Sequence, residues 1–204
     1  MITLAIATGR MAARTIDFLE ESGIYFPDYH NDSRKLVMYD TTNTVKLIFA
    51  KTADLGTYVD KGAADIGIVG KDIIVEEQPD VYELLNFDFS NCRVVVAGFP
   101  NTDLYPGRTL TVATKYPRIA GNFFHSKEQA VEIIPLNGSI ELAPLMGLSD
   151  VIVDIVETGA TLEQNGLVVL EDVLDVSARL IVNKASYATK TEQIEQLISK
   201  LKRK

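Results

Sequence analysis

Residues 137–166 read NGSIELAPLMGLSDVIVDIVETGATLEQNG. Within them, the run 150–156 is rich in valine and isoleucine and carries one acid in its interior, Asp154. The residues at 157–161 are mostly small or hydroxylic, and Ser139 is expected to cap a short helical segment near the start of the stretch. An apolar run of this length bounded by turn signals is typical of a buried parallel strand. The stretch therefore predicts a strand, a tight turn and a helix, the repeating unit of an α/β fold.

The predicted turn has the chemistry of a site for a phosphorylated sugar. A turn that opens a helix presents free backbone N–H groups, and these groups together with the helix dipole favour an anion. Thr158 and Thr161 add hydroxyl donors, and Gly159 allows close approach of the backbone. Asp154 and Glu157 would repel a bare phosphate, but carboxylates accept hydrogen bonds from ribose hydroxyls. The alternative is an ordinary strand-to-helix turn with a capping threonine, and these residues alone leave both interpretations open.

Composition narrows the class of protein. The chain has 204 residues, 47% of them hydrophobic and 24% charged, and a net charge of −8. This charge argues against a general binder of nucleic acid or of membrane surfaces, because the long-range field repels polyanions. Cys92 is the single cysteine, so no internal disulfide is possible and a reducing compartment is expected. No basic region precedes the first apolar stretch and no apolar run reaches transmembrane length, which predicts a soluble, cytoplasmic protein.

Apolar runs alternate with helical patterns along the whole chain, which predicts α/β layers with mainly parallel sheets. No internal repeat or flexible linker is evident. Thr52 and Thr191 are expected to cap two of the helices. Strands are expected at 2–7, 35–39, 45–50, 64–69, 81–88, 91–99, 109–113, 131–136, 150–156, 167–170 and 178–183.

Four strand-to-helix turns could face one cleft, since ligands of open α/β sheets gather at the carboxyl ends of strands. They are expected at 8–10, 70–72, 115–117 and 157–161. Arg10, Lys71 and Lys115 lie in the first three of these turns. A cation at a helix start is unfavourable beside the positive end of the dipole. Each of these side chains either serves an anionic ligand or points into solvent, and the residues leave both alternatives open.

With these turns identified, the sequence resembles the ATP phosphoribosyltransferases of histidine biosynthesis, the HisG family. Residues 137–167 are similar to the family signature almost without a break. Three further blocks match in the expected order, so that the resemblance covers essentially the whole chain: GAADIGIVGKD at 62–72, VATKYPRIAGNFF at 112–124 and SARLIVNKAS at 177–186.

The resemblance implies a fold like that of type II periplasmic binding proteins, with two α/β lobes around a ligand cleft. Lobe I would comprise residues 1–89 and be completed by 176–204, and lobe II, which binds the phosphoribosyl group, would comprise 90–175. The implied reaction joins N1 of the adenine of ATP to C1 of phosphoribosyl pyrophosphate and releases pyrophosphate. Mg²⁺ accompanies the pyrophosphate, without a direct protein ligand.

The chain length resembles the short form of the family, which works with a histidyl-tRNA-synthetase-like regulatory subunit, HisZ. The resemblance implies that this partner carries the feedback by histidine and that the assembly is a hetero-octamer. Neither nucleic acid nor a membrane is implied as a partner. A small-molecule sensor or receptor on the same two-lobed fold, and an inactive scaffold subunit, are the rival interpretations.

The resemblance also assigns roles to residues. Asp154 and Glu157 would hold the ribose hydroxyls, and the segment Thr158, Gly159, Ala160 and Thr161 would hold the 5-phosphate. Asp154, Arg34 and Lys51 are the expected catalytic residues, and Gly9, Arg10, Lys71 and Lys115 are expected to bind the nucleotide and the polyphosphates. The sequence departs from the family pattern at Thr8, where lysine is usual, and at Lys51, where arginine is common. Lysine keeps the charge but loses the bidentate geometry.

Overall fold

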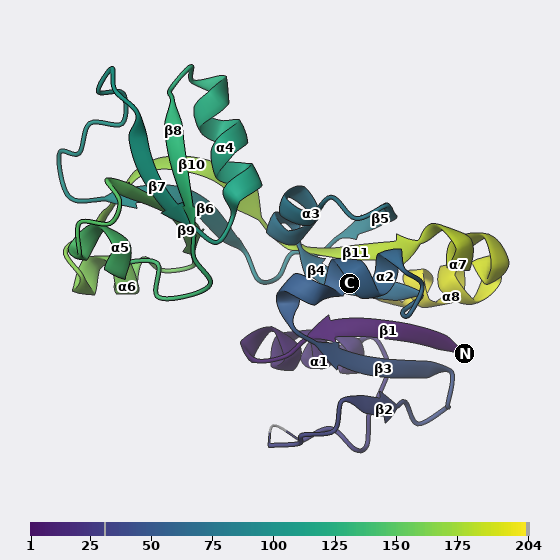
Figure 1. Cartoon of the computed structure of the whole chain (residues 1–204). Coiled ribbons are helices and arrows are strands. Elements are labelled where there is room, and N and C mark those ends of the chain that lie inside the picture. Colours follow the sequence, from purple (N-terminus) through teal and green to yellow (C-terminus); the bar gives the residue numbers. More distant parts are fainter. Residues whose placement is uncertain (31, 203–204) are drawn as a thin grey trace. The chain divides into compact units, whose positions relative to one another are not determined.

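The structure is a computed structural model that describes residues 1–30 and 32–202. The chain divides into two compact units (Figure 1). Unit 1 comprises Met1–Ser90 and Ser177–Lys204, and unit 2 comprises Asn91–Val176. In the described part of the chain, no helix is both long enough and apolar enough to cross a membrane.

Unit 1 is built on a mixed sheet with the strand order β2-β3-β1-β4-β11-β5. The central strand β1 pairs in parallel with β3 and with β4, and β11 pairs antiparallel with both β4 and β5. The strands are β1 (Ile2–Ala7), β2 (Val37–Tyr39), β3 (Val45–Ala50), β4 (Ile66–Gly70), β5 (Val81–Asn86) and β11 (Ala178–Asn183). The helices are α1 (Arg10–Glu21), the short 3₁₀ helix η1 (Thr52–Asp54), α2 (Leu55–Asp60), α3 (Lys71–Glu77), α7 (Lys184–Thr189) and α8 (Thr191–Leu201).

The two faces of this sheet are covered by different helices. Ile16 and Leu19 of α1 and Leu197 of α8 pack in one core cluster with Leu4 and Ile6 of β1. On the other face, α2 packs with alternate residues of β1, because successive side chains of a strand point to opposite faces. Both faces are therefore buried, which explains why β1 is apolar except for Thr3 near its start.

Unit 2 repeats this plan with the strand order β10-β6-β9-β7-β8. β7 pairs in parallel with β8 and with β9, and β6 pairs antiparallel with β9 and with β10. α4 packs against β7 and β8, and residues of α5 and α6 pack on the opposite face with Val95 and Ile152. The elements are β6 (Cys92–Gly98), β7 (Leu110–Thr114), α4 (Pro117–Ser126), β8 (Val131–Pro135), α5 (Leu142–Leu145), β9 (Val151–Val156), α6 (Ala160–Gln164) and β10 (Val168–Val176).

The central parallel strand pair of each sheet begins with the same pair of hydrogen bonds between an aspartate and the backbone of a threonine. We call this arrangement the aspartate clamp. In unit 1 the Thr3 amide donates to Asp65 Oδ2 at 2.8 Å, and the Asp65 amide donates to the Thr3 carbonyl at 2.9 Å. In unit 2 the Thr111 amide donates to Asp150 Oδ2 at 2.8 Å, and the Asp150 amide donates to the Thr111 carbonyl at 3.0 Å. If Thr3 is matched with Thr111 and Asp65 with Asp150, the residues that follow along β1 and β4 correspond one by one to those along β7 and β9.

The alignment gives each polar residue at the end of the unit 2 strands a counterpart in unit 1. The register places Ile6 opposite Ile68 in unit 1 and Thr114 opposite Val153 in unit 2. The counterparts of Thr114, Lys115 and Asp154 are therefore Ile6, Ala7 and Val69, which are at most 1% exposed.

Several expected helix caps differ from the structure. Ser139 does not cap α5, because it takes a left-handed conformation with φ of 48° and the helix begins after Glu141. Thr52 begins η1 with Lys51 as its N-cap, so the first turn is a 3₁₀ turn that α2 continues. Thr191 is likewise the first residue of α8, and its hydroxyl donates to the Tyr187 carbonyl at 2.6 Å instead of capping the helix.

Two elements differ most from the predicted bounds. Helix α7 was not predicted, and it is capped by the Asn183 side chain, which accepts a hydrogen bond from the Ser186 amide at 2.8 Å. Strand β10 continues to Val176 instead of ending at residue 170. Two register shifts in its pairing with β6 interrupt the alternation of side chains, so the sequence pattern hides its length.

Asp65 also attaches the C-terminal helices to the sheet of unit 1. Its carboxylate, 6% exposed, accepts hydrogen bonds from Ser186 Oγ at 2.6 Å and from Lys190 Nζ at 2.8 Å. Burial by itself raises the pKa of Asp65, but the hydrogen bonds from Lys190, Ser186 and the Thr3 amide lower it below its ordinary value. A lowered folded-state pKa contributes stability that is present above the unfolded pKa of about 3.9 and is lost as the pH falls through the folded pKa.

We therefore expect Asp65→Asn to lower the free energy of unfolding by about 1–3 kcal/mol near neutral pH, because the Lys190 ammonium loses its charged acceptor and one carboxylate oxygen is replaced by an NH2 donor. Urea denaturation followed by circular dichroism measures this loss, and the difference from the wild type should shrink below about pH 4. Asp80→Asn is the matched control, since Asp80 pairs with Lys184 but its side chain is 77% exposed. An equal loss in both variants would contradict the role of Asp65.

Candidate functional site

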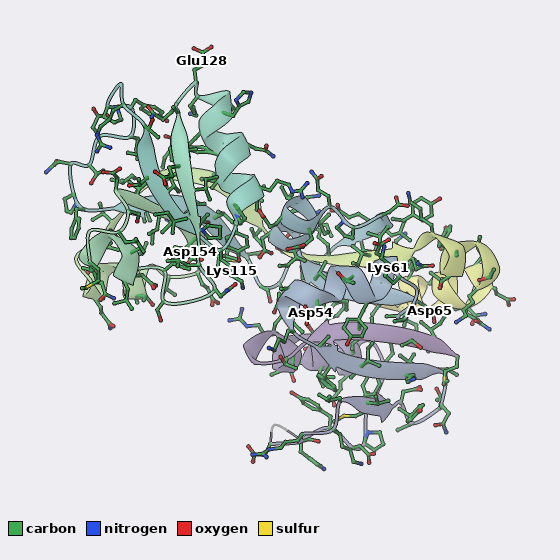
Figure 2. The ribbon with its side chains drawn as sticks, in the orientation of Figure 1. Asp54, Lys61, Asp65, Lys115, Glu128 and Asp154 are labelled. Atoms are coloured by element: carbon green, nitrogen blue, oxygen red, sulfur yellow. The ribbon has the colours of Figure 1, made fainter. Side chains whose placement is uncertain are left out.

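A cation directly after β7 lies near an acid in the second half of β9. Thr114 opposite Val153 is the last pair of the parallel register, so Lys115 and Asp154 continue it by one residue. Figure 2 shows the two labelled side chains close together at this edge of unit 2. Lys115 is exposed and also acts electrostatically on the Asp154 carboxylate. The structure thus brings together two residues that are far apart in the sequence.

Asp154 lies on an otherwise apolar face of the sheet. Its neighbours two residues away on β9, Ile152 and Val156, belong to the core cluster that includes residues of α5 and α6. Burial raises the pKa of Asp154, and the negative charge of Glu141 adds to the rise, whereas the Ile155 amide and Lys115 oppose it. The Ile155 amide donates to Asp154 Oδ1 at 2.8 Å.

The comparison with unit 1 shows that the fold does not require an acid at this position. The counterpart of Asp154 is Val69, which is 0% exposed, and the counterpart of Lys115 is Ala7. The same strand pairing is thus formed with aliphatic residues. A half-buried acid with a raised pKa, at a position where the framework accepts valine, is the kind of residue that functional sites contain.

The turn 157–161 follows the end of β9 and begins three residues after Asp154. Gly159 is the N-cap of α6 and has φ of 83°, a left-handed conformation that glycine adopts without strain. Leu162 is 5% exposed and anchors α6 in the core, whereas Glu157, Thr158, Ala160 and Thr161 are exposed. The Ala160 amide donates weakly to Thr158 Oγ1 at 3.4 Å. The first turn of a helix has amides without intrahelical acceptors, so the turn offers donors to an anion.

The other predicted site residues lie in unit 1, and several share one edge of its sheet. Gly9, Lys51 and Lys71 follow β1, β3 and β4, which are adjacent and parallel. Gly9 is the N-cap of α1 with φ of 86°, and the side chain of Arg10 lies outside the described part of the structure. Arg34 is exposed, and its segment reaches the end of β3 where the Phe49 amide donates to the Leu36 carbonyl at 2.9 Å.

Lys71 differs from the other cations because an acid already holds it. Its Nζ donates to Glu83 Oε2 at 2.6 Å, and Arg179 approaches the other oxygen of the same carboxylate at 3.3 Å. Lys51 is exposed. A ligand anion would therefore compete with Glu83 for Lys71 but would meet an exposed side chain at Lys51.

Glu141 is a residue of this site that sequence reasoning missed. It is half-buried, it precedes α5, and its charge raises the pKa of Asp154. The residue lies within the stretch 137–166, but nothing in a linear sequence indicates that a residue before α5 lies near the end of β9.

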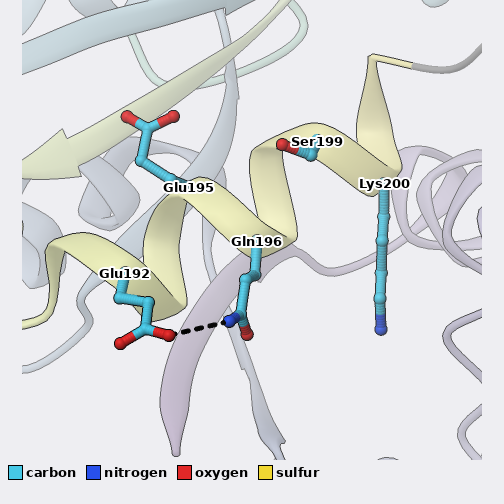
Figure 3. Close-up of a pocket in the computed structure, with 5 residues that line it drawn as sticks. All are labelled: Glu192, Glu195, Gln196, Ser199 and Lys200. Atoms are coloured by element: carbon cyan, nitrogen blue, oxygen red, sulfur yellow. Dashed lines mark hydrogen bonds between the residues drawn. The ribbon is translucent and has the colours of Figure 1, made fainter.

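A surface hollow on the exposed face of α8 has different chemistry. Figure 3 shows its lining, in which Gln196 Nε2 donates to Glu192 Oε1 at 3.3 Å. The lining residues are Glu192, Glu195, Gln196, Ser199 and Lys200. These residues form the solvent side of an amphipathic helix whose other side is buried, and none of the predicted site residues lies there. Among the described residues, no group of three or more His, Cys, Asp or Glu side chains is arranged to hold a metal ion.

Comparisons with known proteins show which family the sequence matches. The HisG family model, described as ATP phosphoribosyltransferase, matches residues 51–203. The ATP phosphoribosyltransferase of Oceanobacillus iheyensis is 48% identical over 200 residues, covering 98% of this chain and 96% of that protein.

Solved structures extend the comparison to the fold. A chain of the ATP phosphoribosyl transferase (HisG:HisZ) complex from Thermotoga maritima superposes with a TM-score of 0.85 and 33% identity, over 98% of this chain and 96% of that one. The alkanesulfonate-binding protein SsuA from Xanthomonas axonopodis superposes with a TM-score of 0.61 at 11% identity, over 98% of this chain and 71% of that one. This second likeness shows the fold alone and confirms the predicted architecture of a two-lobed periplasmic binding protein. The chain therefore belongs to the HisG family of ATP phosphoribosyltransferases, which are transferase enzymes.

Proposed function

We propose that this chain joins N1 of the adenine of ATP to C1 of phosphoribosyl pyrophosphate, releases pyrophosphate, and so performs the first step of histidine biosynthesis. Membership of the family supports this reaction. The observation that carries it is the pair Lys115 and Asp154 at an edge where unit 1 has Ala7 and Val69. Because the fold accepts aliphatic residues there, the charged pair is best explained by a substrate.

The turn 157–161 would hold the 5-phosphate of the pentose. The amides from Thr158 to Thr161 are the donors, with help from the two threonine hydroxyls. Gly159 permits close approach because it has no Cβ, and it adopts its left-handed conformation without strain. Leu162 supports this role, since it fixes the turn to the core and so lowers the cost of ordering it on binding.

Asp154 and Glu157 would accept hydrogen bonds from the ribose hydroxyls. Negative charge close to the ribose also stabilises the oxocarbenium-like character that develops at C1 as pyrophosphate leaves. Adenine N1 already has a lone pair, so no strong general base is needed. Catalysis then consists mainly of the alignment of two substrates and the stabilisation of charge on the leaving group.

Cationic side chains would neutralise the two polyphosphates. Lys115 lies beside Asp154, and Arg34 and Lys51, the other expected catalytic residues, are exposed near the end of β3. Lys71 would have to exchange Glu83 for a phosphate. Gly9 and Arg10 begin α1 and would contribute backbone and side-chain donors to the nucleotide.

Magnesium would enter as a companion of the pyrophosphate, whose charge it neutralises. Mg²⁺ commonly binds through one or two carboxylates together with substrate phosphates and water, instead of an all-protein cage. Because Asp154 and Glu157 would be occupied by the ribose hydroxyls, the ion would be held through the pyrophosphate and not by a direct protein ligand.

We further infer a cytoplasmic enzyme of the short-form type that assembles with a HisZ subunit in a hetero-octamer. Its likeness to a chain of the HisG:HisZ complex, with 96% of that chain covered, supports this arrangement. In such an assembly the partner would carry the feedback by histidine.

Asp154→Asn should retain the fold and lower kcat by more than about tenfold, which corresponds to roughly 1.4 kcal/mol of barrier. The ribose would lose the negative charge of its acceptor while the shape of the side chain is kept. Formation of the adduct from ATP and phosphoribosyl pyrophosphate is followed by absorbance, with and without HisZ. Asp172→Asn is the control, because Asp172 pairs with Arg93 on the surface of the same unit. Turnover of the Asp154 variant at the wild-type rate would remove this role.

Gly159→Ala should weaken binding of phosphoribosyl pyrophosphate by about tenfold. An added Cβ would meet nothing closer than Val156 Cγ1 at 3.9 Å, so the cost is conformational, at about 1–2 kcal/mol for a left-handed residue. The variant is expected to relieve this strain by moving the amides of the turn. Isothermal titration calorimetry measures the affinity, and Gly138→Ala is the control because Gly138 has neither a left-handed φ nor a close neighbour. Equal affinities of the two variants would argue against phosphate binding by this turn.

A further inference from the structure

Thr114 is a buried polar residue whose interactions none of the roles above explains. It ends β7, it is 0% exposed, and it directly precedes Lys115. Its hydroxyl donates to the Val153 carbonyl at 2.6 Å and accepts from the Tyr116 amide at 2.8 Å. One hydroxyl therefore ties the end of β7 to β9 and also fixes the turn that contains Lys115.

Unit 1 shows that the fold itself has no need for this hydroxyl. The counterpart of Thr114 is Ile6, which is also 0% exposed and is paired in the same register with Ile68. An aliphatic side chain is therefore sufficient to form the equivalent strand pair. The two extra hydrogen bonds occur in the unit where charged residues follow on both strands.

We propose that Thr114 is a positioning residue that fixes the backbone next to Lys115 and Asp154 by bridging the Val153 carbonyl and the Tyr116 amide. The proposal rests on the proposed function of that pair in binding phosphoribosyl pyrophosphate. The bond to Val153 fixes the residue before Asp154, and the bond from Tyr116 fixes the residue after Lys115. With both backbones fixed, the Cα positions of Lys115 and Asp154 are set before the substrate arrives, which is the preorganisation that alignment catalysis requires.

The chain supplies a matched control on the same strand. Thr111 lies near the opposite end of β7, and its hydroxyl makes two comparable hydrogen bonds, donating to Asp150 Oδ2 at 2.7 Å and accepting from the Asp150 amide at 2.9 Å. Thr111→Val and Thr114→Val each remove a hydroxyl that links β7 to the start or the end of β9. Only the second change reaches the proposed site.

The experiment compares the full-length variants Thr114→Val, Thr114→Ser and Thr111→Val, each assayed with ATP, phosphoribosyl pyrophosphate and the HisZ subunit. We expect Thr114→Val to lower kcat/KM for phosphoribosyl pyrophosphate by about tenfold or more, because small misplacements of aligned groups are costly. Thr114→Ser should restore most of the activity, and Thr111→Val should remain close to the wild type. Thr114→Ala replaces Thr114→Val if the valine variant does not fold.

The pH profile separates positioning from a loss of stability. Burial and the charge of Glu141 raise the pKa of Asp154, whereas the charge of Lys115 lowers it. Displacing Lys115 should therefore raise the pKa of Asp154 further. The acidic limb of kcat/KM should therefore move to higher pH in Thr114→Val and stay in place in Thr111→Val. Wild-type kcat/KM in a folded Thr114→Val or Thr114→Ala variant would overturn the proposal, as would an unshifted acidic limb. If Asp154→Asn is also fully active, the proposed function fails with it; if Asp154→Asn is inactive, only the role of Thr114 is lost.

Discussion

The parallel pairing of β7 with β9 is the constraint on which the site depends. Its register begins where Asp150 holds the Thr111 amide and ends where Thr114 bonds the Val153 carbonyl. Between these two points the residues of both strands are apolar and fully buried. The next residue after the last pair is polar on each strand, Lys115 on one and Asp154 on the other. The pairing thus converts two distant segments of sequence into one edge that bears a cation, an acid and a turn rich in donors.

The two units show what the fold needs and what the proposed chemistry adds. Both sheets use the aspartate clamp at the start of the parallel pair, so this feature serves the framework. At the other end, unit 1 has Val69 where unit 2 has Asp154. Burying an acid with a raised pKa is unfavourable for folding, and such positions tend to be functional. The comparison of the two units therefore distinguishes the aspartates that the framework uses from Asp154, for which we propose a role in binding substrate.

Much of the fold could be predicted because most of its strands are rich in apolar residues, and β1, β3 and β11 begin and end where expected. The repeat between the units was not evident, because the clamped pairs are separated by 62 residues in one unit and by 39 in the other. Asp154 could be singled out as an acid within an apolar run. The contributions of Glu141 and Thr114 could not, since they depend on loop paths and strand register rather than on local pattern.

The most direct test of the account is a crystal structure of the chain with bound phosphoribosyl pyrophosphate. The account predicts the 5-phosphate on the amides of Thr158–Thr161 and the ribose hydroxyls within hydrogen-bond distance of Asp154. A pentose bound with its phosphate away from this turn, or with Asp154 making no contact to the sugar, would contradict it.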